Sequence, residues 1–167
     1  MKKLVTLISL LLLTSCAQAQ NSALEFSPED QIFAEMMIPH HEQAIVMADL
    51  ALKISQTPTI RELAQGIRTA QGPEIEAMKR WGASKMGSHA GHSMNGMLTD
   101  LQMKTLSSAI GGEFDRLFLE SMIEHHRGAI EMAEMVINSK NKSAAELGKA
   151  IIVSQQREID QMRKLLS

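Results

Sequence analysis

The feature that most constrains the fold of this chain is an internal repeat. Residues 36–48 read MMIPHHEQAIVMA, and residues 121–133 read SMIEHHRGAIEMA, 85 positions later. A second pair of phrases, QGPEIEAM at 71–78 and QQREIDQM at 155–162, is 84 positions apart. The slip of one residue falls between the two phrases, in the expected turn, where a deletion is tolerated. The chain therefore contains two copies of one helical hairpin.

Capping signals and composition place the helices. Ser27-Pro28 and Thr57-Pro58 each combine an N-cap residue with a first-turn proline, which is typical of a helix start. The 167 residues include thirteen Met but only four Phe, one Trp and no Tyr, so aliphatic side chains and thioethers must fill the interior. The expected helices run from 28 to about 54, from 58 to about 81, from 100 to 110 with a stop at Gly111-Gly112, from there to about 137, and onward from a capping box formed by Ser143 and Glu146.

The connection between the two hairpins has a different composition. Residues 82–99 are rich in Gly, Ser, His and Met and show no periodicity, which predicts a mobile connector. Two hairpins joined in this way most simply close as one all-α domain, a four-helix bundle with twofold pseudo-symmetry over residues 27–167.

The N-terminus resembles a secretory leader. Residues 1–15 read MKKLVTLISLLLLTS, with two lysines before an apolar run that is too short to span a bilayer. Leu13-Thr14-Ser15-Cys16 resembles a bacterial lipobox, in which the cysteine is lipidated. Cleavage after Ala17-Gln18-Ala19 is the alternative and would release a soluble protein. We prefer lipidation because it explains the position of the only cysteine; residues 16–26 are then a tether.

Both readings of the leader place the mature protein outside the cytoplasm, in the periplasm or cell envelope. The formal net charge is −2, and it becomes more negative when the leader lysines are removed. No stretch of the chain concentrates basic residues, so we expect no binding to nucleic acid.

Each hairpin carries two adjacent histidines at the buried stripe of its first helix. In the second copy the stripe contains Phe118, Met122 and Ala129, and helical periodicity places His125 and His126 on either side of it. A lone inward histidine is more often a satisfied core residue, and methionine at helical spacing more often packs. Burying two imidazoles per hairpin is nevertheless costly unless the ring nitrogens find partners, and a metal ion is a common partner of a neutral ring. We therefore predict a metal site in the bundle.

The donor atoms favour copper. Thioethers prefer soft ions such as Cu(I), imidazole suits copper in either oxidation state, and silver(I) should compete for the same donors. The connector adds Met and His residues with nothing to pack against, although a linker of biased composition is the alternative. The expected metal-binding residues are Met37, His40, His41, Met47, Met122, His125, His126 and Met132 in the helices and Met86, His89, His92, Met94 and Met97 in the connector, with Met36, Glu74, Met78, Glu158 and Met162 as secondary candidates.

Pro39 interrupts the hydrogen-bonding pattern of the first helix immediately before His40. The simpler interpretation is a helix that curves around its core with the proline toward solvent. In the other interpretation, the kink frees the carbonyl of Glu35 and re-aims His40.

The doubled M-I-x-H-H-x-x-A-I-x-M-A phrase, the Q-x-x-E-I-x-x-M phrase and the Met/His connector resemble the family catalogued as domain of unknown function 305 (DUF305), which includes CopM-like periplasmic copper-binding proteins. The resemblance covers residues 27–166 and implies a ferritin-like four-helix bundle that binds Cu(I) and silver through Met and His in copper tolerance. Ser121 departs from the pattern, because Met36 occupies the same position in the first copy.

Three functions remain open at this stage. The first is a copper(I) buffer or carrier in the cell envelope, which would exchange its ion with a copper exporter or chaperone. The second is a di-metal redox bundle, which the sequence disfavours because Met37 and Met122 stand where the Glu of a Glu-x-x-His motif is needed. The third is a metal-free helical module that binds another protein. No catalytic constellation is present, and the Met-rich faces leave dimerisation open.

Overall fold

The structure is a computed structural model that describes residues 25–81 and 94–167. Within these residues it contains five helices and no strand: α1 (Pro28–Ile54), α2 (Pro58–Lys79), α3 (Asp100–Ser108), α4 (Gly111–Ala133) and α5 (Lys142–Leu166). The leader with Cys16 and residues 82–93 of the connector lie outside the described residues, so the predictions made for them stay predictions.

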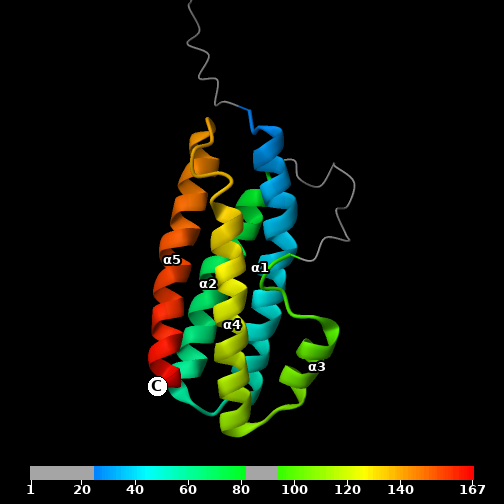
Figure 1. Cartoon of the computed structure of the whole chain (residues 1–167), viewed down its shortest axis with the longest axis vertical. Coiled ribbons are helices and arrows are strands. Elements are labelled where there is room, and N and C mark those ends of the chain that lie inside the picture. The colour runs from blue at the N-terminus through cyan, green and yellow to red at the C-terminus, as the bar shows by residue number, and fades with distance from the viewer. Residues whose placement is uncertain (1–24, 82–93) are drawn as a thin grey trace, which may run out of the picture.

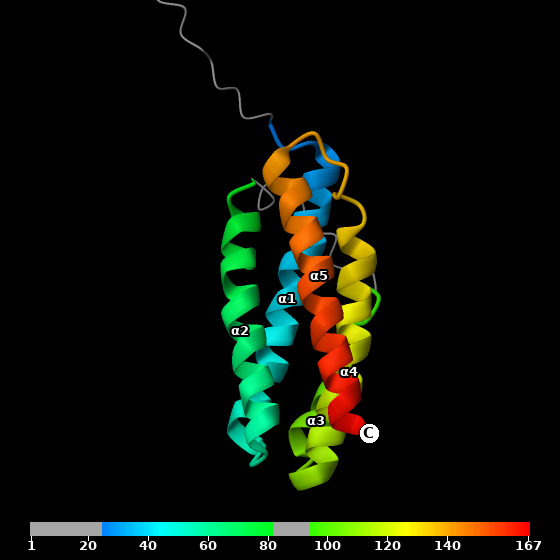
Figure 2. The same cartoon turned by 90° about the vertical axis from the view of Figure 1, so that its left-hand side faces the viewer.

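The four long helices form the predicted bundle (Figure 1). α1 packs along α2, α4 packs along α5, and α1 packs against α4. Figure 2 shows the four long helices running nearly parallel to one axis, with the short α3 beside the lower half of the bundle. The prediction of two helical hairpins closed on each other as an all-α bundle is therefore confirmed.

The helix ends agree with their capping signals in some places and not in others. Ser27 and Asp30 form a capping box at the start of α1, as the Ser-Pro sequence suggested. The predicted box at the start of the last helix is wrong, because Asn141 is the N-cap and its side chain accepts from the next backbone N–H groups. Gly111 does not end α3 but begins α4, with a φ of +59° that favours glycine.

The hydrophobic core consists of two clusters stacked along the bundle axis. The upper cluster, in the orientation of Figure 1, contains Phe33, Met37, Met78, Trp81, Met132, Val136 and Ile151. The lower cluster contains Met47, Leu63, Ile67, Phe114, Phe118, Met122, Ile159 and Met162. On α1 and α4 the histidines come between the residues of these clusters, so they form a polar level in the middle of an apolar interior.

Two aspartates tie the hairpins together at opposite ends of the bundle. Asp30 of α1, only 1% exposed, accepts a 3.0 Å hydrogen bond from Ser139 Oγ in the α4–α5 turn. Asp115 of α4 occupies the equivalent position and accepts a 2.5 Å hydrogen bond from Thr57 Oγ1 in the α1–α2 turn. The aspartate that the repeat places in both hairpins is thus a contact between them.

α1 continues as one helix through Pro39, and α2 continues through Pro73. The helical assignment of α1 fits the simpler interpretation of Pro39, in which the helix accommodates the proline without a break. No helix in the described part of the chain is both long and apolar enough to cross a membrane.

Candidate metal site

All four histidines of the repeat point into the bundle. His40 and His41 on α1 and His126 on α4 are fully buried, and His125 is 1% exposed. Adjacent residues of a helix differ in direction by about 100°, so both members of a pair can face inward only at the centre of a wide buried stripe. The flanking residues Glu124, Arg127 and Glu131 are exposed. The predicted orientation of the histidine pairs is therefore correct.

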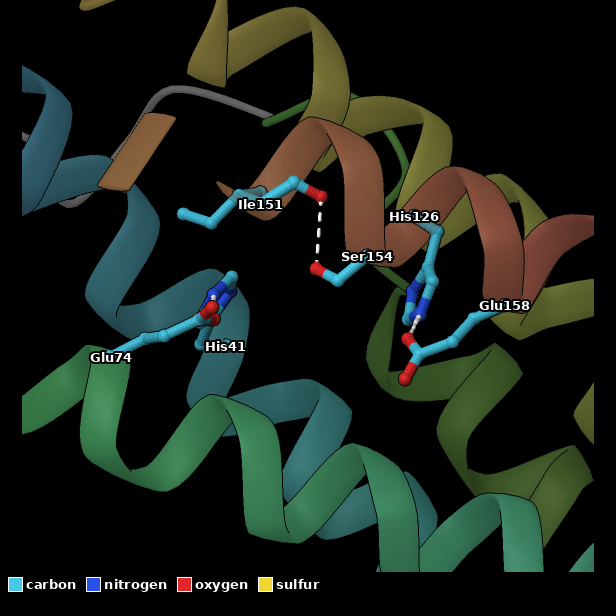
Figure 3. Close-up of polar contacts among 6 residues, drawn as sticks. All are labelled: His41, Glu74, His126, Ile151, Ser154 and Glu158. Atoms are coloured by element: carbon cyan, nitrogen blue, oxygen red, sulfur yellow. Dashed lines mark hydrogen bonds and ion pairs between the residues drawn. The ribbon is translucent and has the colours of Figure 1, made fainter. Parts of the chain in front are cut away.

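One histidine of each pair bonds to a glutamate of the neighbouring helix. His41 Nε2 lies 2.9 Å from Glu74 Oε2, and His126 Nε2 lies 2.6 Å from Glu158 Oε2. Figure 3 shows both pairs, each joining the two helices of one hairpin. The glutamate side chains remain 17% and 19% exposed, so they lie at the rim of the interior. The two secondary carboxylate candidates thus serve as partners of the histidines.

The other two histidines meet across the seam between the hairpins. The rings of His40 and His125 are 3.8 Å apart between centroids and are inclined by 41°. His40 Nε2 also lies 3.2 Å from the backbone oxygen of Asn95, in the connector. Neither ring nitrogen of His125 makes a hydrogen bond of normal geometry. The centre of the site is therefore a pair of closely packed, tilted imidazoles with few polar partners.

The hydrogen bonds fix which nitrogen carries the proton in three of the rings. A carbonyl or ionised carboxylate oxygen only accepts, so the Nε2 atoms of His40, His41 and His126 must donate. In a neutral imidazole the lone pair is then on Nδ1. The Nδ1 atoms of these three rings are buried and have no hydrogen-bonding partner. In its neutral form each of these rings therefore presents a lone pair to the core, where a cation can bind it.

Burial keeps the central rings neutral. Loss of hydration lowers the pKa of His40 from 6.5 to about 3, the charge of His41 and of His126 lowers it further, and the Asn95 carbonyl opposes the shift. Burial also lowers the pKa of His125 well below the usual histidine value, and His40 is the next largest cause. Both rings are therefore deprotonated at neutral pH, which is the form that binds metals.

Sequence reasoning did not select two buried amides near the histidines. Gln71 on α2 and Gln155 on α5 are each 2% exposed, and neither the oxygen nor the nitrogen of either amide has a hydrogen-bonding partner. Each lies three residues before the glutamate that bonds to a histidine, so both belong to the polar level. The repeated Q-x-x-E spacing was the sequence signal that could have identified these two glutamines. A buried polar residue that occurs in both halves is costly unless it has a partner.

The predicted sulfur ligands are distributed differently from the histidines. Met37, Met78 and Met132 belong to the upper cluster, and Met47, Met122 and Met162 belong to the lower one. All six are buried among hydrophobic side chains, which by itself accounts for their position. Sulfur ligation by these methionines stays a prediction. Met36 is half-buried at the edge of the upper cluster.

Part of the Met/His connector is also placed. Met94 and Met97 are half-buried, and Met94 packs against the upper cluster. Met86, His89 and His92 lie outside the described residues. The last part of the predicted mobile connector is therefore seated on the bundle next to His40, because Asn95 and Leu98 hydrogen-bond to α1.

The polar level offers neutral nitrogen donors in a dry interior. Within residues 25–81 and 94–167, no three His, Cys, Asp or Glu side chains are already arranged around one point as in a typical divalent metal site. The unpartnered Nδ1 atoms and amides instead suit an ion that accepts few ligands and carries little charge. This donor chemistry fits the monovalent soft ion that the sequence predicted.

Comparisons with known proteins agree with the fold. A family model described as a domain of unknown function (DUF305) matches residues 30–166. A DUF305 protein from Streptomyces coelicolor is 29% identical with a TM-score of 0.76, over 83% of this chain and 90% of that one. A DUF305 fragment from Deinococcus radiodurans is 30% identical, with a TM-score of 0.76 over 86% and 98% of the two chains.

CopM is a further structural relative. Its Cu(I)-bound form is 35% identical, with a TM-score of 0.68 over 81% of this chain and 94% of that chain. CopM has also been solved in Cu(II)-bound, Ag-bound and apo forms. None of the curated proteins compared with the chain matches it. The family match over residues 30–166, on a bundle whose two hairpins each bury a pair of histidines, shows that this chain belongs to the DUF305 family.

Proposed function

We propose that this chain binds monovalent copper, and silver(I) in competition with it, at the polar level of the bundle. The observation that carries the proposal is the set of buried Nδ1 atoms of His40, His41 and His126, which have no hydrogen-bonding partner and which carry a lone pair when the rings are neutral. CopM, a structural relative of this chain that has been solved with Cu(I) and with Ag, supports the same class of ion. The protein would act as a buffer or carrier of the ion in copper homeostasis and tolerance.

Charge favours a monovalent ion. The central rings are neutral, and a single positive charge costs less to bury than two. Imidazole and thioether donors both bind Cu(I) without a thiolate, which suits an oxidising compartment. Met37 and Met122 lie one helical turn from His40 and His125, so they are the first candidates for an added sulfur ligand.

The placement outside the cytoplasm is part of this proposal. The Streptomyces relative is named a secreted protein, which agrees with the leader-like residues 1–15 of this chain. Lipidation at Cys16 would hold the protein at a membrane surface, and an exporter or chaperone would exchange the ion with it. We propose neither an enzymatic reaction nor binding to nucleic acid.

The two other functions are less well supported. A di-metal redox bundle needs carboxylates that bridge two ions. Glu74 and Glu158, however, each bond to a histidine of their own hairpin. A metal-free interaction module would leave the unpartnered buried imidazoles and amides without an explanation.

A competition titration against a chromophoric Cu(I) chelator tests the proposal. All proteins carry Cys16→Ser, so that the only thiol cannot bind Cu(I). The chain should withdraw Cu(I) from the chelator, and the double variant His40→Leu/His125→Leu should lose at least 100-fold in affinity. Met135→Leu, an exposed thioether in the turn after α4, is the control and should bind normally. Unchanged binding by the double variant would refute the site, and iron uptake with oxygen consumption would favour the redox bundle.

A further inference from the structure

Residues 94–98 cross the seam between α1 and α4, next to the tilted pair of His40 and His125. The Asn95 carbonyl accepts from His40, and the Asn95 side-chain amide donates to Glu131 Oε2 of α4 at 2.9 Å. Gln43 of α1 holds the other end of the segment, because its amide bonds to both the N–H and the C=O of Leu98, at 2.7 and 2.9 Å. The segment is therefore attached to both hairpins by side-chain hydrogen bonds.

The segment is a tight turn pressed against α4. Met97 N donates to Met94 O at 3.2 Å, and Gly96 at the third position has a φ of +85°. A Cβ atom on Gly96 would lie 2.5 Å from the Glu124 carbonyl oxygen, and a Cβ on Gly128 would lie 1.8 Å from the Asn95 oxygen. Only glycine at both positions permits this approach, so the turn is seated at one defined place.

The repeat departs from symmetry where the turn is seated. Gly128 of α4 is the counterpart of Gln43 of α1 at the 85-residue offset. One position therefore supplies the amide that holds the turn, and the other provides the space that the turn occupies. The two positions that contact the turn are thus related by the repeat but carry different residues.

The turn carries two methionines that flank the Asn95-Gly96 dipeptide. Met94 and Met97 occupy the ends of the turn, where Cα atoms are within about 7 Å of each other. Both are half-buried, whereas the methionines of the two core clusters are almost fully covered. Asn95, one of the two residues between them, accepts a hydrogen bond from His40 through its backbone oxygen. A soft ion arriving from solvent can thus meet these thioethers before it meets a histidine.

We propose that the Met94–Met97 turn receives the monovalent soft cation and that displacement of the turn opens the path to His40 and His125. This inference rests on the proposed function. The imidazoles are at most 1% exposed, so an ion reaches them only when a covering element moves. Moving the turn breaks side-chain hydrogen bonds to Gln43, Glu131 and His40 and leaves the packing of the long helices in place.

The first test measures the rate of Cu(I) transfer from a chromophoric chelate to the full chain, in the Cys16→Ser background. Met94→Leu/Met97→Leu keeps the apolar volume and removes both sulfurs. The double variant should take up Cu(I) at least five-fold more slowly than the parent. Met135→Leu is the matched control and should show the parent rate.

The second test displaces the turn. Gly128→Ala should raise both the uptake and the release rates several-fold and should increase hydrogen exchange at the amides of residues 96–98. Gly66→Ala on α2 is the control, because nothing lies within 4 Å of an added Cβ there. Gln43→Ala, which removes only the bonds to Leu98, serves the same purpose if Gly128→Ala does not fold.

The outcomes separate this inference from the proposed function. If the chain binds Cu(I) tightly but neither the thioether variant nor the displaced-turn variants change the rates, the turn has no role in uptake and the inference is overturned. If the parent chain withdraws no Cu(I) from the chelate, the proposed function itself fails. Slower uptake without sulfur, together with faster exchange on displacement, supports the turn as the receiving site.

Discussion

The central histidines make a quantitative prediction about stability in acid. For a group with a pKa of about 3 when folded and 6.5 when unfolded, the unfolded chain binds the proton and the folded chain does not. Stability is then fully present above pH 6.5 and falls as the pH is lowered toward the folded value. Between pH 7 and pH 5 the loss is about 2 kcal/mol for His40 alone. The pKa of His125 is lowered as well, mainly by burial, so this ring adds to the loss.

The informative variant is His125→Leu. It removes the ring that has no hydrogen bond and leaves His40 buried, so the loss between pH 7 and pH 5 should be smaller than in the parent, by at most about 2 kcal/mol. At pH 7 the free energy of unfolding should rise by about 1 kcal/mol, since a buried polar group without hydrogen bonds is replaced by an apolar one. Contributions from other titrating groups are common to both proteins and cancel in the comparison.

Urea unfolding followed by circular dichroism, in the presence of a metal chelator, gives the required free energies at each pH. The free energy of unfolding is extrapolated linearly to zero urea. The slopes of this dependence, the m-values, are compared between parent and variant, because a difference would indicate a change in the unfolded state. An equal acid loss in parent and variant would show that His125 is already protonated or hydrated in the folded protein. That result would remove the argument for neutral donors at the centre of the bundle.

Three further predictions concern other parts of the structure. Glu74→Gln should weaken Cu(I) binding about 10-fold or more and shift the ¹⁵N signals of His41 away from the Nε2-protonated form, whereas Glu76→Gln, exposed on the same helix, should change neither. Gly148→Ala should lower the free energy of unfolding by about 1–3 kcal/mol, since its Cβ would lie 2.7 Å from a methyl of Val136, and urea titration checks this. Asp30→Ala should lower the free energy of unfolding by about 2 kcal/mol in the same assay, because the Ser27 N–H and the Ser139 hydroxyl both lose their acceptor. A loss below about 0.5 kcal/mol would contradict the role of Asp30 as a contact between the hairpins.

The fold was largely predictable because the repeat applies the same constraint twice. The buried stripe around Phe118 and Met122 fixed the inward face of α4, and the repeat transferred it to α1. The orientation of the histidines followed from the same periodicity. The errors are at helix ends, where Asn141 rather than Ser143 caps α5 and Gly111 begins a helix instead of ending one. Several capping residues stood close together there, and only the tertiary path of the turn selects among them.

The candidate site was predictable in its residues but not in its hydrogen bonds. Sequence spacing identified His41 and Glu74 as inward residues. It could not show that they bond to each other, because that depends on the axial register between α1 and α2. Asn95 was unpredictable for a stronger reason: the connector has no periodicity, so nothing in the local sequence places its carbonyl beside His40. The available signal for a contact at this place was the difference between Gln43 and Gly128. The two copies of the repeat are otherwise similar, but at this position their side chains differ in both size and polarity.

The turn contacts two positions, Gln43 and Gly128, that can differ only because the two hairpins belong to one chain. Two identical hairpins that associate about a symmetry axis must carry the same residue at both related positions, and a change on one side is a change on the other. A duplicated and fused chain is free of that restriction. Gln43 can anchor a passing segment while Gly128, its counterpart on the facing helix, leaves room for the same segment, which two identical hairpins could not do.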